Sequence, residues 1–119
     1  MSKLIGNVDV LGTEYEIYIQ GEKENPKLEG NDGICEWYTK SILIDTDSKN
    51  ECDTFDNIDA YYHKVLRHEA FHALFHEAGL SDYAKDEKLV DALAILYPKM
   101  QKIMETMDNT KLDLWGYGK

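Results

Sequence analysis

Apolar and polar residues alternate along the first part of the chain in the way expected of strands with one buried face. Tyr15, Ile17 and Ile19 alternate with polar or amphipathic residues, and Val8 to Leu11 lead into the Gly12-Thr13 pair. A period of two residues places every second side chain on the same face of a strand. We therefore expect a β-hairpin from Asn7 to Gln20.

A second pair of strands is expected after a polar segment. Residues 21–33 contain Pro26, Gly30 and the sequence Asn31-Asp32-Gly33, which are typical of loops and turns. Residues 34–45 then resume an apolar pattern, with Trp37 and Tyr38 in the first strand, a turn near Thr39-Lys40, and Ile42 to Ile44 in the second strand.

The pattern changes to a helical period in the second half of the chain. The first helix is expected from about Ile58 to Ala78, capped by Asp56 or Asn57 and ended by Gly79 with Leu80 packing back. A second helix, capped by Ser81 or Asp82, should run to about Met107 with a kink or restart at Pro98. Its apolar residues recur every three or four positions and predict a buried stripe formed by Leu89, Leu93, Leu96, Met100, Ile103 and Met107.

These elements predict an α+β fold. A small antiparallel sheet of two N-terminal hairpins would pack on two or three helices in one domain that spans residues 1–119. Residues 1–45 would be mainly β and residues 58–107 mainly α. The tail from Lys111 to Lys119 would form a short strand or cover an edge.

Charge and cysteine content narrow the function classes. The formal net charge is −10, whereas nucleic acids and anionic membranes are bound by Lys and Arg; neither is an expected partner. Cys35 and Cys52 lack the spacing of a Cys-rich zinc site and are expected to be free thiols. Without an N-terminal apolar run that resembles a signal peptide, the protein is expected in the cytoplasm.

The clearest chemical signal is His68-Glu69-Ala70-Phe71-His72 within the first helix. Residues four apart lie on one face of a helix, so His68 and His72 can direct both imidazoles at one metal ion. Glu69 lies about 100° further round the helix and can reach a water molecule at the metal. An H-E-x-x-H helix therefore predicts two zinc ligands and a general base.

A catalytic zinc site normally has a third protein ligand. Glu87 is the best candidate because it begins the next helix, and Asp91, one turn later, is the alternative. His76 continues the one-turn spacing but drifts off the ligand face, so it is a candidate supporting residue of the site. Tyr83 is a candidate donor to a developing oxyanion, with Tyr61 and Tyr62 as alternatives.

From about Ser41 to Pro98 the chain resembles the ImmA/IrrE-type zinc metallopeptidases of phages and mobile elements. The resemblance lies in His68–Ala73, in Gly79-Leu80 and in Glu87–Ala94. It implies a minimal gluzincin domain in which His68, His72 and Glu87 bind zinc and Glu69 is the base. Many members carry Glu-x-Glu-Ala on the second helix, where this chain has Leu89-Val90, so Asp91 stays an alternative ligand. The resemblance also implies that Ser41–Asp45 is an edge strand to which a substrate peptide adds.

The expected function is metal-dependent hydrolysis of a peptide bond, with a phage or host regulator as one class of protein substrate. A rival hypothesis is a regulatory binding module whose zinc site is structural or vestigial, with His76 or a cysteine as the fourth ligand. An acidic mimic of nucleic acid ranks last because only the net charge supports it.

Overall fold

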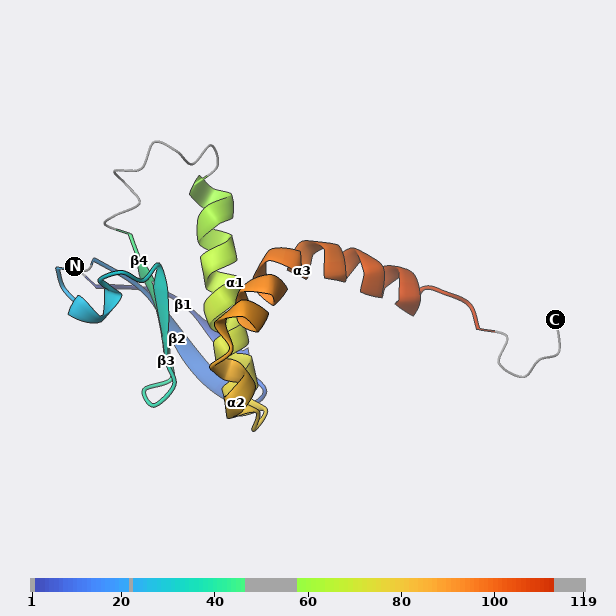
Figure 1. The fold of residues 1–119 in the computed structure, drawn as a ribbon, viewed down its shortest axis with the longest axis horizontal. Coiled ribbons are helices and arrows are strands. Elements are labelled where there is room, and N and C mark those ends of the chain that lie inside the picture. Colours follow the sequence, from blue (N-terminus) through green and yellow to red (C-terminus); the bar gives the residue numbers. More distant parts are fainter. Residues whose placement is uncertain (1, 22, 47–57, 113–119) are drawn as a thin grey trace.

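The computed structural model of this 119-residue chain describes residues 2–21, 23–46 and 58–112. It confirms the α+β class: a four-stranded sheet is followed by helices (Figure 1). The strands are β1 (Lys3–Val10), β2 (Thr13–Gln20), β3 (Gly33–Glu36) and β4 (Ser41–Asp45). The helices are α1 (Ile58–Glu77), α2 (Ser81–Ala84) and α3 (Glu87–Asp108), with a 3₁₀ turn, η1 (Pro26–Leu28), between β2 and β3.

Both predicted strand pairs form, and a parallel contact joins them. β1 pairs with β2 and β3 pairs with β4 in antiparallel fashion, whereas β2 and β4 run parallel. A parallel neighbour needs a crossing connection, and residues 21–32, with the buried Leu28, supply it. The sheet is therefore mixed, with strand order β1-β2-β4-β3.

The strand order corrects the prediction that Ser41–Asp45 lies at an edge. β4 lies between β2 and β3, and its residues Ile42 to Asp45 are buried, so the edge strands of this sheet are β1 and β3. β3 is also shorter than predicted: it ends at Glu36, and Trp37 and Tyr38 lie in the turn before β4. Lys40 has a φ of 57° there, a left-handed conformation suited to a tight turn.

Helix α1 ends as its sequence predicts. Gly79 has a φ of 78°; its N–H bonds to the carbonyl of His76, and the Leu80 N–H bonds to the carbonyl of Phe75. This pair of hydrogen bonds is the Schellman motif, which satisfies carbonyls that the helix end leaves free. The predicted caps Asp56 and Asn57 at the start of α1 lie outside the described residues.

The predicted second helix is in fact two helices. The chain forms the short α2, breaks at Lys85 and begins again at Glu87. The N-cap of α3 is Asp86, not Ser81 or Asp82: its side chain accepts a hydrogen bond from the Leu89 N–H at 3.0 Å. The break matters because it turns the first residues of α3 back toward α1.

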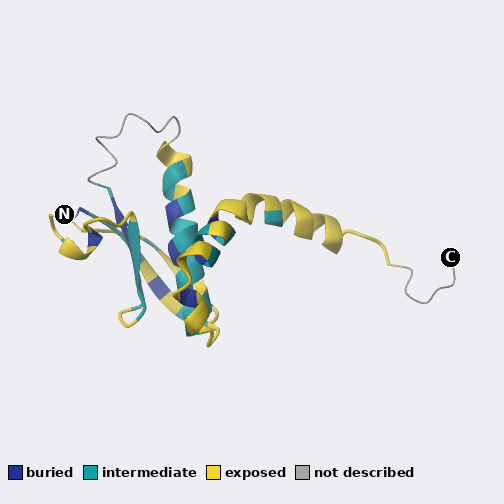
Figure 2. Ribbon diagram, in the orientation of Figure 1, coloured by how far each residue is buried: buried dark blue, intermediate teal, exposed yellow. Residues whose placement is uncertain are grey.

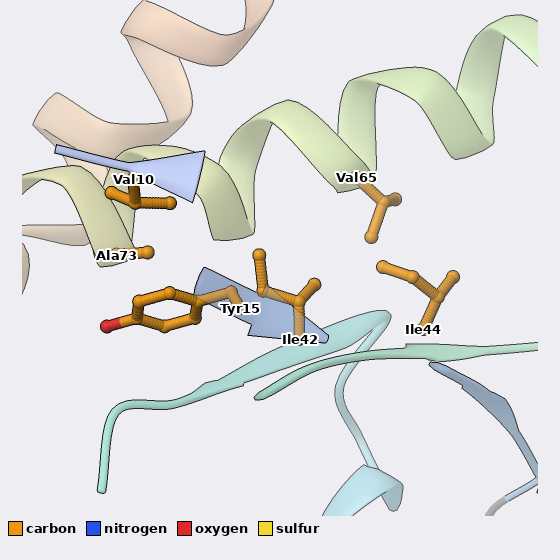
Figure 3. Close-up of a cluster of buried hydrophobic side chains, with 6 residues drawn as sticks. All are labelled: Val10, Tyr15, Ile42, Ile44, Val65 and Ala73. Atoms are coloured by element: carbon orange, nitrogen blue, oxygen red, sulfur yellow. The ribbon is translucent and has the colours of Figure 1, made fainter. Parts of the chain in front are cut away.

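The core lies between α1 and one face of the sheet, where the six side chains of Figure 3 meet: Val10, Tyr15, Ile42, Ile44, Val65 and Ala73. At the end of α1, Glu77 fixes this arrangement. Its carboxylate accepts hydrogen bonds from Tyr15 at 2.6 Å, Thr13 at 3.0 Å and Lys40 at 2.7 Å. The helix is thereby tied to β2 and to the turn before β4.

None of the six residues of the predicted apolar stripe of α3 is buried: Leu89, Leu93 and Met100 are half-buried, and Leu96, Ile103 and Met107 are 46%, 54% and 58% exposed. The residues that α3 buries against the body are Val90 and Ala94, which lie beside that stripe. Figure 2 shows the outer half of α3 exposed as it leaves the body. The helix stays continuous through Pro98 and curves along its length (Figure 1). Among the described helices, none has the length and apolar character that crossing a membrane requires.

Candidate metal centre

The break between α2 and α3 brings the first turn of α3 beside the middle of α1. Arg67 on α1 donates a hydrogen bond from Nε to the carbonyl of Ala94 at 2.9 Å, which fixes the contact between the helices. Across it, ligand atoms of His68, His72 and Glu87 all lie within 4.8 Å of one another. The three residues predicted as metal ligands are therefore brought together.

The distances inside this group are short and nearly equal. The two imidazole Nε2 atoms of His68 and His72 are 3.2 Å apart. The Glu87 carboxylate lies 3.1 Å from the first and 3.2 Å from the second. Tetrahedral zinc with bonds of about 2.0–2.1 Å separates neighbouring ligand atoms by about 3.3–3.4 Å. The donor set fits zinc in both atom type and spacing.

The hydrogen bonds at Nδ1 of His68 and His72 determine which ring nitrogen can act as an acceptor toward Glu87 and the other ring. His72 Nδ1 lies 2.6 Å from the carbonyl oxygen of Ala84, which can only accept, so Nδ1 carries the proton. His68 Nδ1 lies 3.2 Å from an oxygen of Asp91, and a hydrogen bond from Lys64 keeps the pKa of that carboxyl below its usual value. In neutral rings both Nε2 atoms therefore present lone pairs to the centre.

Three acceptors thus converge with no hydrogen-bond donor among them. Lone pairs of two imidazoles and a carboxylate repel one another unless a positive charge lies between them. A proton on one ring would relieve part of this repulsion, whereas a divalent cation can bond to all three groups. Ring nitrogens whose partners are a carboxylate and a backbone carbonyl are the usual arrangement behind metal-bound histidines.

Asp91, the alternative ligand, occupies a different place. Its carboxylate lies behind the His68 ring, at Nδ1, and 2.9 Å from the Lys64 ammonium. It orients the ring from the side opposite to Glu87. The two acids are one helical turn apart, and the arrangement gives each a separate partner on the same imidazole.

Glu69, the candidate base, is 5% exposed and lines the same cleft. Burial, reinforced by the nearby carboxylates of Glu87 and Asp32, raises the pKa of Glu69 to about 8. Burial disfavours the charged form of a carboxyl, and neighbouring negative charges add to that effect. A divalent cation bound by the neighbouring cluster would lower this pKa again, toward the ionised form that a general base requires.

The cleft lies between the edge strand β3 and the two helices. Its volume is about 540 Å³. Gly33, Ile34 and Cys35 of β3 line one side, and the histidines and acids of α1 and α3 line the other. An edge strand has unpaired backbone groups on its outer side. The cleft therefore combines main-chain donors and acceptors with a cluster of metal-ligating side chains.

The remaining candidate residues lie away from the cluster. His76 lines the cleft, but its ring stacks on Trp37 with centroids 4.7 Å apart, and its Nδ1 lies 3.1 Å from the Ser81 hydroxyl. Burial and the nearby His72 lower the pKa of His76. Tyr83 is 53% exposed, with its ring 6.1 Å from that of Phe75, and it does not line the cleft.

Tyr61 and Tyr62 pack against the hydrophobic core instead of facing the cluster. Cys35 lines the cleft without joining the cluster, and burial raises the pKa of its thiol to about 12. Cys52 lies outside the described residues.

Three contributors to the site had not been expected from the sequence. The carbonyl of Ala84 has no side-chain signal, because any residue offers the same backbone oxygen. Lys64 precedes His68 by four residues, a spacing that places it one turn away on α1, where it meets Asp91. Gly33 belongs to a turn signal in the sequence, and nothing there indicates that it would face Glu69.

Comparisons with models of protein families, with curated proteins and with solved structures give no match to this chain.

Proposed function

We propose that this protein is a zinc-dependent metallopeptidase of the ImmA/IrrE type. The observation that carries the proposal is the convergence of two imidazole Nε2 atoms and one carboxylate at 3.1–3.2 Å from one another. A divalent cation can bond to all three groups, and a buried carboxyl, Glu69, lies in the same cleft. Three protein ligands with a position left for water are typical of catalytic zinc.

In this proposal His68, His72 and Glu87 would hold a zinc ion, which would lower the pKa of a bound water toward about 7 and polarise the substrate carbonyl. Glu69 would accept a proton from the water that attacks the peptide carbonyl and would then pass the proton to the leaving amine nitrogen. The hydrogen bonds from Nδ1 to Ala84 and Asp91 keep each ring in the tautomer that zinc binding needs.

The substrate would be a peptide bound in extended form along β3. Backbone groups on the outer side of an edge strand pair with an added strand, which gives affinity without requiring a specific sequence. β3 takes the role that the resemblance had assigned to β4, because β3 is the strand that lines the cleft. A phage or host regulator with an exposed segment is the class of protein that fits this mode.

The test is hydrolysis by the Glu69→Gln variant. Glutamine keeps the size of the side chain but cannot take up the proton, so zinc content should stay the same while turnover falls by at least about 100-fold. The matched control is Glu105→Gln, the same change on the exposed outer half of α3. Equal hydrolysis by wild type and Glu69→Gln would refute the proposed role.

The rival hypothesis of a structural zinc site requires a fourth protein ligand. Within the part of the chain that the structure describes, the candidate set contains His68, His72 and Glu87, and neither His76 nor Cys35 belongs to it. This count of three supports the enzyme. X-ray absorption of the zinc-loaded protein tests it directly: a shell of two nitrogens and two or more oxygens fits the peptidase, and a sulfur or a third imidazole fits the rival.

A further inference from the structure

The first residue of β3, Gly33, lies against α1 with no room for a side chain. A Cβ atom at this position would lie 2.9 Å from Val65 Cγ1, 3.1 Å from Glu69 Cγ and 3.1 Å from Glu69 Oε2. Contacts this short force neighbouring atoms to move, because carbon atoms pack at about 3.5–4.0 Å. Gly33 does not have a left-handed φ, so space, and not backbone conformation, is what requires glycine here.

Of the two side chains that Gly33 faces, that of Glu69 is held by packing within the part of the chain that the structure describes. Glu69 is 5% exposed, and its carboxylate has no hydrogen bond or ion pair with any of the described residues. Packing must therefore determine where the carboxylate lies. The backbone of β3 at Gly33 is one wall of that packing, and it closes the cleft on the side opposite to the cluster of His68, His72 and Glu87.

We propose that Gly33 is a positioning residue: by lacking a side chain, it lets the edge strand press directly on Glu69 and sets the carboxylate in the cleft. This inference rests on the proposed peptidase function. A methyl group at residue 33 would push the Glu69 carboxylate and β3 away from each other. β3 is also the strand to which a substrate peptide would add. At 3.1 Å the neighbouring side chain must move by a few tenths of an ångström. A displacement of about 1 Å can lower a rate by about 100-fold, and we take this as the upper end of the expected loss.

The experiment compares Gly33→Ala with Gly6→Ala. Gly6 also lies in a strand, β1, without a left-handed φ, but a Cβ there meets no atom within 4 Å. We expect Gly33→Ala to lower kcat roughly 10- to 100-fold on a quenched fluorescent peptide cleaved by the wild type, with KM within about twofold and zinc content unchanged. Gly6→Ala should match the wild type within about twofold. A kcat of Gly33→Ala within about twofold of the wild type would overturn the inference.

A double variant separates Glu69 from the fold of α1. Gly33→Ala with Val65→Ala removes the shortest contact, the one of 2.9 Å, and keeps both contacts to Glu69. Compared with Val65→Ala alone, the double variant should still lose kcat roughly 10- to 100-fold. Recovery to the rate of Val65→Ala would mean that Gly33 acts through helix packing, and would overturn the inference. The double variant also makes room for the methyl group if Gly33→Ala alone does not fold.

A spectroscopic measurement makes the outcome independent of turnover. In the cobalt-substituted protein, the visible spectrum reports the groups around the metal and its solvent ligand. Gly33→Ala should change that spectrum as Glu69→Gln does, whereas Gly6→Ala should not. A spectrum of Gly33→Ala equal to the wild type, when Glu69→Gln differs, overturns this inference alone. A wild type without metal-dependent hydrolysis overturns the proposed function, and the spectra then decide on Gly33.

Discussion

Replacing Asp91 by Asn tests the assignment of Glu87 as a ligand and Asp91 as the partner behind the His68 ring. The substitution removes one negative charge and keeps the size of the side chain. Asp91 Oδ1 lies 3.2 Å from His68 Nδ1, so a cation bonded to Nε2 would be about 7 Å from the lost charge, measured through the ring.

The magnitude follows from Coulomb's law. Zinc together with the bound Glu87 carboxylate carries a net charge of about +1. At an effective dielectric constant of about 20, two unit charges about 7 Å apart interact by about 2.4 kcal/mol, which corresponds to about 60-fold in affinity. This agrees with the loss of about 10- to 100-fold that is typical when a residue behind a metal-bound histidine is replaced. We therefore expect Asp91→Asn to weaken zinc binding by about 10- to 100-fold.

The assay is competition for zinc with a chromophoric chelator at fixed pH and ionic strength. Asp108→Asn is the matched control, because it makes the same change on α3 about 25 Å further along the helix; its zinc affinity should stay within about twofold of the wild type. Glu87→Gln should lose more affinity than Asp91→Asn, since it removes a ligand. If Asp91→Asn bound zinc as the wild type does, or more weakly than Glu87→Gln, the assigned roles would be wrong.

Three further predictions concern stability. Hydrogen bonds from Lys40 and Tyr15 lower the pKa of Glu77 from 4.5 to about 2. The ionised Glu77 therefore stabilises the folded state fully above pH about 4.5, and this stabilisation is lost as the pH falls toward about 2. In urea titrations, the difference in the free energy of unfolding between wild type and Glu77→Gln should shrink over that range. Asp86→Ala removes the α3 cap and should cost about 1 kcal/mol in the free energy of unfolding, whereas Asp86→Ser should restore most of it. Gly79→Ala, at a φ of 78°, should cost about 1–2 kcal/mol and Gly79→Asn less, in the same titrations.

The sequence predicted the features that depend on residues close together in the chain: the helix face of the two histidines, the end of α1 and the two hairpins. His68 and His72 share a helix face because residues four apart always do, and Gly79 ends α1 because a left-handed residue is needed there. The two hairpins follow from the alternation of apolar residues and from their turns. In each case the interacting groups lie in one helix or in two strands joined by a short turn.

Features that depend on distant contacts were not predictable in the same way. Alternation gives the strands but not their order, so the parallel pairing of β2 with β4, and hence the edge position of β3, came only with the structure. Glu87 and Asp91 lie on one face of α3, and the crossing of the helices, not their spacing, assigns them to opposite sides of the His68 ring.

The helical period of α3 predicted an apolar face, but a period does not supply a partner for that face. Beyond Tyr97, whose ring contacts that of Phe71, the helix leaves the body, so Ile103 and Met107 stay exposed. The cap at Asp86 was available in the sequence, as an acid three residues before Leu89, but Ser81 and Asp82 offered the same signal earlier in the chain.

The most direct test of the central claim is a crystal structure of the zinc-soaked protein with anomalous diffraction recorded at the zinc edge. The account predicts one strong peak about 2.0–2.2 Å from His68 Nε2, His72 Nε2 and a carboxylate oxygen of Glu87, with Glu69 facing it across the cleft. A peak that lacks any of these three ligands, or no peak at this cluster, would contradict it.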